Sequence, residues 1–114
     1  MEPIPVFYDE VDRSAVAIKP KQPFLDWTNA LTPDFPQTES LGIIYLVKMM
    51  DDNKAVETWL KKNYKKIFEN ELNGQSTVEE DWPTKRDWKL FNEWFDYSVH
   101  PLVVDILEGP VKKY

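Results

Sequence analysis

The segment spanning residues 41–50 constrains the fold of this chain more than any other. It reads LGIIYLVKMM, which is apolar almost throughout and is broken only by Lys48. A strand that is apolar on both faces is usually buried on both faces, as in the middle of a parallel sheet. We therefore expect a layered domain in which residues 41–50 form the central strand.

The composition favours a packed core. The 114 residues include five Trp, five Tyr and six Phe, and these side chains contribute large buried areas. A chain of this length buries about two thirds of its unfolded surface and folds without disulfides or metals. We expect a single domain over residues 1–114. Residues 1–12 are expected to form an N-terminal arm or edge strand, because Pro3 and Pro5 suit only an edge, and residues 108–114 a frayed tail.

Two elements are predicted before the central strand. Residues 13–19 (RSAVAIK) mix β-branched side chains with alanine and stop at Pro20, which indicates a first core strand. Pro23 then suits the first turn of a helix. The helix is supported by side chains that share one face at helical spacing, namely Phe24, Trp27, Thr28 and Leu31.

A long helix is predicted after the central strand. Residues 51–53 offer capping side chains, and Gly74 is a typical stop. Between them, apolar residues recur at steps of three and four: Val56, Trp59, Leu60, Tyr64, Ile67, Phe68 and Leu72.

A last helix and a last strand complete the pattern. Thr84 is expected to cap the helix, with Asp87 three residues later in a variant of the capping box. The helix is expected to run to about Val99, before Pro101. Residues 102–107 (LVVDIL) then indicate the final strand.

This order of elements predicts an α/β fold. Strand, helix, strand, two helices and strand favour a small three-stranded, mostly parallel sheet in the order 1-2-3, packed with three helices. The layout resembles the barstar-like fold, a resemblance of architecture that carries no function. The alternative is an α+β fold with an extra N-terminal edge strand at residues 4–8.

The predicted last helix has an unusually wide apolar face. At about 100° per residue, its apolar side chains cover an arc of about 200°, which exceeds the stripe of an ordinary surface helix. Either both halves of the arc are core, or one half is exposed and binds a partner. The first half contains Trp88, Phe91, Phe95 and Val99, and the second Leu90, Trp94 and Tyr97. The predicted partner surface is therefore Trp82, Leu90, Trp94 and Tyr97.

Residue counts exclude several kinds of chemistry. The absence of cysteine excludes thiolate catalysis and disulfides. His100 is the only histidine, and its place before Pro101 suggests a helix C-terminal role. The three glycines are too far apart to form a phosphate-binding loop. We therefore expect no metal, no cofactor and no catalytic set, and we do not favour an enzyme.

The net charge narrows the class of partner. Twenty acidic and fourteen basic residues give a formal charge of −6. Such a balance argues against binding to nucleic acid or to an anionic membrane. It permits a basic partner, or it is simply typical of a soluble surface, which we favour. A large exposed apolar patch would indicate a protein partner or a homodimer. The N-terminal segment lacks the basic and apolar regions of a signal peptide, so we expect a cytoplasmic protein.

Two strings resemble a known family. KPKQPFLDW (residues 19–27) and WPTKRDWKLFNEWF (residues 82–95), with a closing VVDIL, resemble a family of small uncharacterised bacterial cytosolic proteins. Its members are sometimes labelled VacJ automatically. True VacJ lipoproteins carry a signal peptide and a lipidated cysteine, and we expect neither in this chain. The resemblance implies a bacterial cytosolic setting and brings no catalytic residues.

Polar residues near element ends form a second candidate site. In open α/β sheets, ligands bind beyond the carboxyl ends of strands, and Lys19 lies at such an end. Asp105 interrupts an apolar strand, so we expect a salt bridge to Arg13 or Arg86, with an acid–base role as the alternative. The full set is Lys19, Lys21, Gln22, Asp26, Arg86, Asp87 and Asp105.

Two hypotheses of function follow. The first is a non-enzymatic protein-interaction or regulatory module, supported by the acidic surface and the wide aromatic face. The second is a small ligand-binding protein or enzyme that uses carboxylates together with Arg86 and Lys19.

Overall fold

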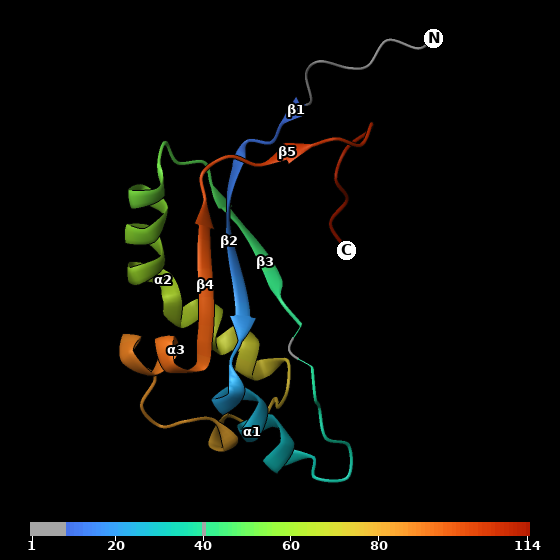
Figure 1. The fold of residues 1–114 in the computed structure, drawn as a ribbon, viewed down its shortest axis with the longest axis vertical. Helices are drawn as coiled ribbons and strands as arrows, with labels where there is room; N and C mark the ends of the chain where they lie inside the picture. The colour runs from blue at the N-terminus through green and yellow to red at the C-terminus, as the bar shows by residue number, and fades with distance from the viewer. Residues whose placement is uncertain (1–8, 40) are drawn as a thin grey trace.

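The computed structural model describes residues 9–39 and 41–114. Within these residues the chain forms three α-helices, one short 3₁₀ helix and five strands (Figure 1). The main sheet has the order β3-β2-β4, and a small sheet pairs β1 with β5. The elements are β1 (Asp9–Glu10), β2 (Arg13–Pro20), α1 (Gln22–Leu31), β3 (Ile43–Lys48), α2 (Asn53–Asn73), η1 (Glu79–Asp81), α3 (Trp88–Trp94), β4 (Phe95–His100) and β5 (Val104–Asp105).

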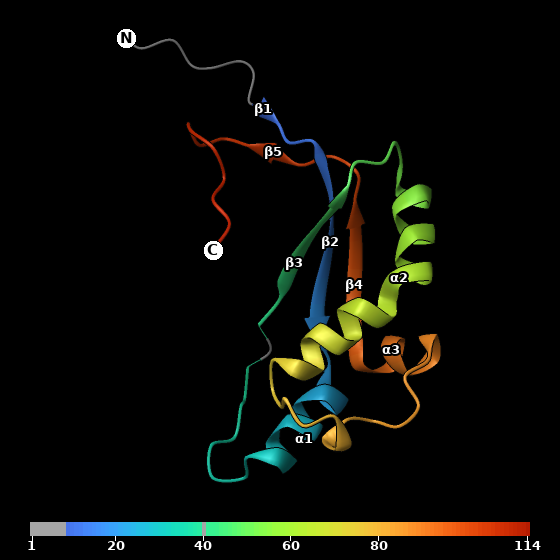
Figure 2. The same cartoon turned by 180° about the vertical axis from the view of Figure 1, so that it is seen from behind.

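The helices all lie on one side of the main sheet or at one end of it. Helix α2 packs against β2 and β4, and Figures 1 and 2 show it behind the sheet and in front of it, respectively. Helices α1 and α3 contact each other at the end where β2 finishes and β4 begins. Within the described residues, no helix covers the opposite face of the sheet.

The prediction of a mostly parallel sheet in the order 1-2-3 is wrong. Strand β2 is antiparallel to both neighbours, with Ile18 opposite Ile43 on one side and opposite Tyr97 on the other. Strands β3 and β4 therefore point in the same direction, and α2 lies in the connection between them. The element order predicted a helical crossover between two parallel strands, and β3 and β4 are joined in this way. These two strands are not neighbours, because β2 lies between them. All neighbouring strands are antiparallel as a result.

The predicted central strand is an edge strand. Residues 43–48 form β3 at the border of the main sheet, and β2 takes the centre. Only one face of β3 packs on the core, so Ile44 keeps 61% of its surface exposed and Leu46 keeps 49%. The apolar run therefore does not mark burial on both faces here.

The predicted last helix is a short helix followed directly by a strand. Helix α3 ends at Trp94, and β4 runs from Phe95 to His100. Asp87, rather than Thr84, caps α3 by accepting a hydrogen bond from the backbone N–H of Leu90 at 2.9 Å. The predicted apolar arc was too wide because it was drawn on a single helix. Residues 88–94 follow the helical period of 3.6, whereas residues 95–100 follow the strand period of 2.

Other predicted elements are confirmed. Residues 13–20 form β2, and α1 and α2 occupy the predicted segments. The Asp52 side chain caps α2 by accepting from Ala55 N–H at 2.8 Å, and Gly74 is the C-cap. The predicted last strand is reduced to Val104–Asp105, because residues 106–114 form no strand. Residues 4–8 lie outside the described residues.

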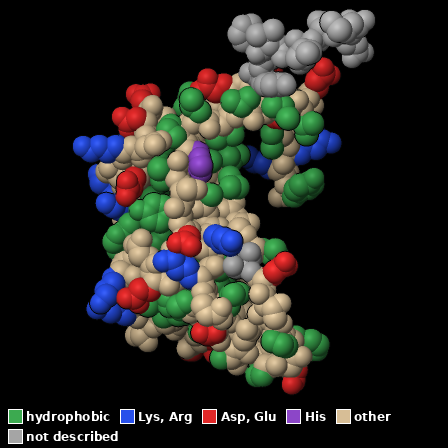
Figure 3. All heavy atoms as spheres, in the orientation of Figure 1, with side chains coloured by type: hydrophobic (Ala, Val, Ile, Leu, Met, Phe, Trp, Pro, Cys, Tyr) green, Lys and Arg blue, Asp and Glu red, His purple; other side chains and the backbone are tan. Residues whose placement is uncertain are grey.

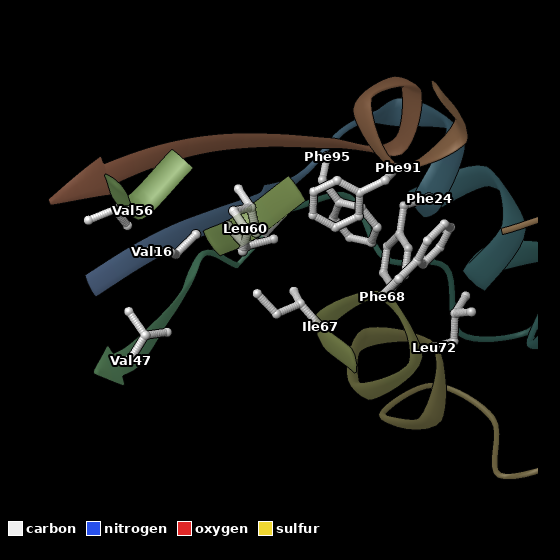
Figure 4. Close-up of a cluster of buried hydrophobic side chains, with 11 residues drawn as sticks. Val16, Phe24, Val47, Val56, Leu60, Ile67, Phe68, Leu72, Phe91 and Phe95 are labelled. Atoms are coloured by element: carbon white, nitrogen blue, oxygen red, sulfur yellow. The ribbon is translucent and has the colours of Figure 1, made fainter. Parts of the chain in front are cut away.

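Four phenylalanines from different elements hold the helices to the sheet. Phe24 of α1, Phe68 of α2, Phe91 of α3 and Phe95 of β4 point toward one another (Figure 4). The ring centroids of Phe24 and Phe95 are 5.1 Å apart, and those of Phe91 and Phe95 are 5.2 Å apart. Tilted aromatic pairs at such distances stabilise a core beyond their buried area. Toward the other end of the sheet the core is aliphatic, with Val16, Val47, Val56 and Leu60.

A buried hydroxyl joins the strand ends at the far end of the sheet. Ser14 is fully buried on the core face of β2. Its Oγ donates to the carbonyl of Pro101 and accepts from the backbone N–H of Met50, both at 2.9 Å. One side chain therefore connects β2 to the chain after β4 and to the chain after β3.

Replacing Ser14 with alanine should destabilise the fold. Ser14→Ala leaves the Met50 N–H and the Pro101 carbonyl without this partner, so we expect a loss of about 1–3 kcal/mol in the free energy of unfolding. Urea denaturation followed by circular dichroism measures it. Ser98→Ala, on an exposed position of β4, is the matched control and should change stability by less than about 0.5 kcal/mol. Equal effects of the two substitutions would show that the Ser14 bridge is not needed.

Candidate functional site

We call the outward face of the main sheet the open face. It is apolar in the middle of β2 and β3 and polar along β4, where Ser98 and His100 lie opposite Ala17 and Ala15. Its side chains alternate with those that enter the core, as in any half-covered sheet. Ala15 lies opposite Leu46, and Ala17 lies opposite Ile44, so four apolar side chains adjoin in the middle. The core cluster includes none of these four residues, which agrees with their position on the other side of the sheet.

Charged side chains border the open face at both ends. At one end Lys19 of β2 lies opposite Asp96 of β4. At the other end Arg13 lies opposite Lys48 of β3, and two basic groups thus share one border. Arg13 forms an ion pair with the neighbouring Asp12 at 2.8 Å, whereas Lys48 forms none within residues 9–39 and 41–114. This end of the open face is therefore suited to an acidic partner.

Beyond the main sheet, β1 and β5 continue as a projecting ribbon. We call β1, β5 and residues 106–114 the arm. Its two strands pair at Asp9–Asp105 and Glu10–Val104, and the Val11 N–H donates to the Val103 carbonyl at 2.8 Å. Figures 1 and 2 both show the arm extending away from the helices. The radius of gyration is 17.1 Å, against about 13 Å for a compact chain of this length.

The arm carries apolar side chains that the chain itself does not cover. Leu107 is 77% exposed, and the others are more than half exposed. An extended segment with so much exposed apolar surface is unusual for an isolated monomer. The set consists of Val104, Ile106, Leu107 and Val111.

The arm and the open face together form a concave surface. A cleft of about 500 Å³ lies between the arm and β3, with Leu46 on the sheet side and Val104, Leu107 and Val111 on the arm side. Figure 3 shows the surface hollowed between the arm and the sheet. A second hollow of about 480 Å³ continues along Ala17 and Ile44 toward the other end of the sheet.

A further polar cluster lies on the helix side of β3. Glu71 of α2 is only 6% exposed, and its carboxylate accepts a hydrogen bond from the Tyr45 hydroxyl. The Asn70 amide donates to the same hydroxyl at 2.9 Å. Burial raises the pKa of Glu71 above its usual range, while the bond from Tyr45 opposes this rise. Burial and the bond to Glu71 also raise the pKa of Tyr45.

The four residues of the predicted partner surface are half-buried. Trp82, Leu90, Trp94 and Tyr97 all pack against the core. The indole N–H of Trp82 donates to the Ser76 carbonyl at 2.9 Å. The Tyr97 hydroxyl donates to Glu57 at 3.0 Å, and burial raises the pKa of this tyrosine.

Part of the predicted polar set is brought together at the start of α1. The Lys21 ammonium donates to the Asn92 carbonyl at 2.7 Å and lies 3.5 Å from the carboxylate of Asp96. Lys19 adjoins the same Asp96 across the strands. Gln22 donates to Asp26 at 2.8 Å along the exposed side of α1. These contacts connect α1 to the junction of α3 and β4.

The other members of the polar set lie apart. Arg86 donates to the Pro83 carbonyl at 2.8 Å, and its guanidinium carbon is 5.6 Å from the centroid of a Trp82 ring. Asp87 caps α3, and the hydrogen bond from Leu90 lowers its pKa. Asp105 lies in the arm and accepts from the Leu107 N–H at 2.9 Å. Among the described residues it forms no ion pair with an arginine, so the expected salt bridge is not found.

His100 does not lie at a helix end. It is the last residue of β4, and its Nε2 is 2.8 Å from the Ser98 hydroxyl on the open face. The expected helix C-terminal role is therefore wrong, because the chain has already left α3 at Trp94.

Sequence reasoning missed the open face, the arm cleft and the buried Glu71. The alternation in FDYSVH was a signal for a half-covered strand, since Phe95, Tyr97 and Val99 alternate with polar residues. Glu71 falls between Phe68 and Leu72 on the predicted helix, which places it near the apolar stripe. Only the register of β2 could reveal that Ile44 and Leu46 face outward.

The described residues contain no group of three or more His, Cys, Asp or Glu side chains arranged to hold a metal ion. None of the helices in the described ranges has the length and apolar character to span a membrane. No protein-family model matches the chain, and comparisons with curated proteins and with solved structures find no significant match.

The raised pKa of Glu71 predicts a specific dependence of stability on pH. The folded state holds the proton of Glu71 more tightly than the unfolded chain, whose glutamates have the ordinary pKa of 4.5. The free energy of unfolding contributed by this group therefore falls as pH rises from 4.5 through the folded pKa. Glu71→Gln removes this titration, so between mildly acidic and neutral pH the variant should lose less stability than the wild type.

Urea denaturation over that pH range measures the difference. Glu69→Gln, an exposed position on the same helix, is the matched control and should follow the wild type. Parallel pH profiles for the wild type and Glu71→Gln would contradict the assignment of a raised pKa to Glu71.

Proposed function

We propose that this chain is a protein-interaction module that pairs with a second copy of itself through the open face and the arm. The observation that carries the proposal is the cleft between Leu46 and the arm, which is apolar on both sides. In the proposed pair, the arm of each copy lies in the cleft and along the open face of the other. The interface is then isologous, so every contact is made twice.

Exposed apolar surface supports the existence of an interface. Monomeric soluble proteins rarely expose large contiguous apolar patches, and such patches commonly mark association sites. Ile44 and Leu46 of the sheet adjoin the cleft that Leu107 and Val111 complete. Strand β3 also has an unpaired backbone edge within the described chain, which is a further site for association.

Charge complementarity supports a second copy as the occupant. The arm carries both signs of charge, with the exposed acidic residues Asp9, Glu10 and Glu108 and the exposed Lys112 and Lys113 near its end. The border of the open face nearest the arm carries Arg13 and Lys48. In the proposed two-fold pairing, Asp9 and Glu10 of one arm lie near Arg13 and Lys48 of the other copy, and this match of opposite charges favours association.

The available apolar surface is sufficient for a stable pair. Fully burying one Leu, Ile or Val side chain contributes about 1.5–3 kcal/mol. Val104, Ile106, Leu107 and Val111 of the arm are each more than half exposed, and in the proposed pair the symmetry buries each of them twice. Their combined contribution can offset the cost of association and leave the roughly 8 kcal/mol that a micromolar dimer needs.

We also propose a bacterial cytoplasmic setting and no nucleic-acid or membrane partner. The resemblance of KPKQPFLDW and WPTKRDWKLFNEWF to small bacterial cytosolic proteins supports the setting. The formal charge of −6 supports a protein partner over a polyanion. A role without catalysis is favoured because Lys19, Arg86 and Asp105 make separate local contacts and do not converge on one cavity.

Sedimentation velocity of the full chain tests the pairing. The wild type should shift from monomer to dimer as the concentration rises through the micromolar range. Leu46→Lys places a charge in the cleft, and Leu107→Lys does so from the arm side. Each should weaken the dimer by at least about tenfold, which corresponds to 1.4 kcal/mol.

Val78→Lys is the matched control, because Val78 is 51% exposed, close to the 49% of Leu46, but lies before η1 and far from the cleft in the sequence. It should leave the dimer unchanged. A wild type that stays monomeric at every concentration would refute the proposal. So would a dimer that neither Leu46→Lys nor Leu107→Lys weakens.

A further inference from the structure

A separate pocket lies on the helix side of the sheet, between α1, residues 37–39 and 41–43, and the end of α2. Its volume is about 610 Å³, within the range of cavities that hold small organic molecules. Phe24 and Leu25 of α1 form one wall, and Leu41 and Ile43 form another. The α2 side contributes Glu71, the single buried carboxylate of the pocket. The rest of the polar lining consists of Gln37, Thr38, Glu39 and Gln75.

Hydrogen bonds hold the Glu71 carboxylate in place. The Tyr45 hydroxyl donates to Oε2, and Asn70 donates to that hydroxyl at 2.9 Å. Within the described residues, Oε1 accepts no hydrogen bond and remains available. At the rim, the Gln37 amide donates to the side-chain oxygen of Gln75 at 3.3 Å, which connects the loop to α2. The carboxylate is therefore oriented before any ligand arrives, as binding sites require.

The pocket lacks a positive charge of its own. Its lining contains Glu71 and the exposed Glu39 but no lysine, arginine or histidine. Among residues 9–39 and 41–114, no basic group forms an ion pair with Glu71. Buried carboxylates are normally paired, because removing an isolated charge from water is costly. The missing counter-charge is what a ligand can supply.

We propose that this pocket binds a small organic cation, namely an ammonium group attached to an apolar body. The ammonium lies against Oε1 of Glu71, and the apolar body packs against Phe24, Leu25 and Ile43. A charge-assisted hydrogen bond fixes the polar end, and the apolar walls bind the remainder. The site is independent of the proposed dimer, since Leu46 and the arm do not line it.

The proposal predicts how binding depends on pH. The ionised carboxylate is the form that binds an ammonium group, and burial raises the pKa of Glu71. Amines with a lysine-like pKa of about 10.4 stay charged at neutral pH. The groups that face Glu71 are Tyr45 from β3 and, at the pocket lining, Glu39 from the loop, while α1 presents Phe24 and Leu25. Amine binding should therefore strengthen as pH rises through the raised pKa of Glu71 and level off above it.

The test uses 2-phenylethylamine and its neutral counterpart 2-phenylethanol as probes. Both are titrated into the full chain while the methyl signals of Leu25 and Ile43 are followed by NMR. We expect saturable shifts with the amine and at least about tenfold weaker binding of the alcohol, as for loss of one charge-assisted contact. Glu71→Gln should reduce amine binding to the level of the alcohol, whereas the matched control Glu69→Gln should bind like the wild type.

A second variant separates binding from folding. Tyr45→Phe keeps the carboxylate and removes the hydrogen bond that opposes the raised pKa, so it should bind the amine with the pH midpoint shifted upward. Equal affinity of the wild type for amine and alcohol would overturn the proposal. Wild-type affinity of a folded Glu71→Gln variant for the amine would also overturn it. Tighter binding of the amine than of the alcohol by the Leu46→Lys variant would show that the pocket binds independently of the dimer.

Discussion

The packing of four phenylalanines at one end of the sheet determines the rest of this structure. Phe24, Phe68, Phe91 and Phe95 bring α1, α2, α3 and β4 to a single point. Because every helix contributes to this cluster, all three helices stay on the same side or end of the sheet. The helices then have no contact with the other face. The apolar side chains of that face, Ile44 and Leu46 among them, are not covered by the described part of the chain.

The position of β2 follows from the same arrangement. The connection from β3 to β4 contains α2, η1 and α3, and α2 packs over the core face. Strand β2 lies between β3 and β4 with antiparallel pairing on both sides. Strands β2 and β4 are thus long-range partners whose ribbon continues past the sheet as β1 and β5. Where the main sheet ends, the two hydrogen bonds of Ser14 connect β2 to the segments that follow β3 and β4. The arm is therefore an extension of a well-anchored ribbon, which can present apolar side chains at a defined distance from the open face.

The sequence was sufficient to predict the elements whose periodicity is simple. Residues 13–20 alternate in composition and stop at proline, and α2 has a cap at Asp52, a regular apolar stripe and a stop at Gly74. The switch at Phe95 was missed because aromatic residues continue across it, so a helix and a strand merged into one wide arc. The edge position of β3 was missed because an apolar run does not reveal which strands flank it. Topology depends on contacts between distant residues, which local patterns do not encode.

The candidate sites depend on the same long-range information. Leu46 and Leu107 are separated along the chain by sixty-one positions, yet they line one cleft. The local sequence shows Glu71 only as one residue of a predicted helix. Its burial in a pocket depends on distant residues, namely Tyr45 of β3 and the side chains of α1 that form a pocket wall. The predicted aromatic surface was inferred from one helical arc, but its residues belong to two elements, α3 and β4, and to the loop before them. Sequence reasoning therefore suggested an interaction surface from aromatic content and placed it at different residues from those that the open face presents.

Isotope-filtered NOE spectroscopy tests the central claim most directly. A mixture of labelled and unlabelled full chains reports only contacts between copies. The account predicts intermolecular NOEs between the methyl groups of Ile106 or Leu107 on one copy and those of Ile44 or Leu46 on the other. NOEs that place another surface at the contact, or none at concentrations where the chain is dimeric, would contradict it.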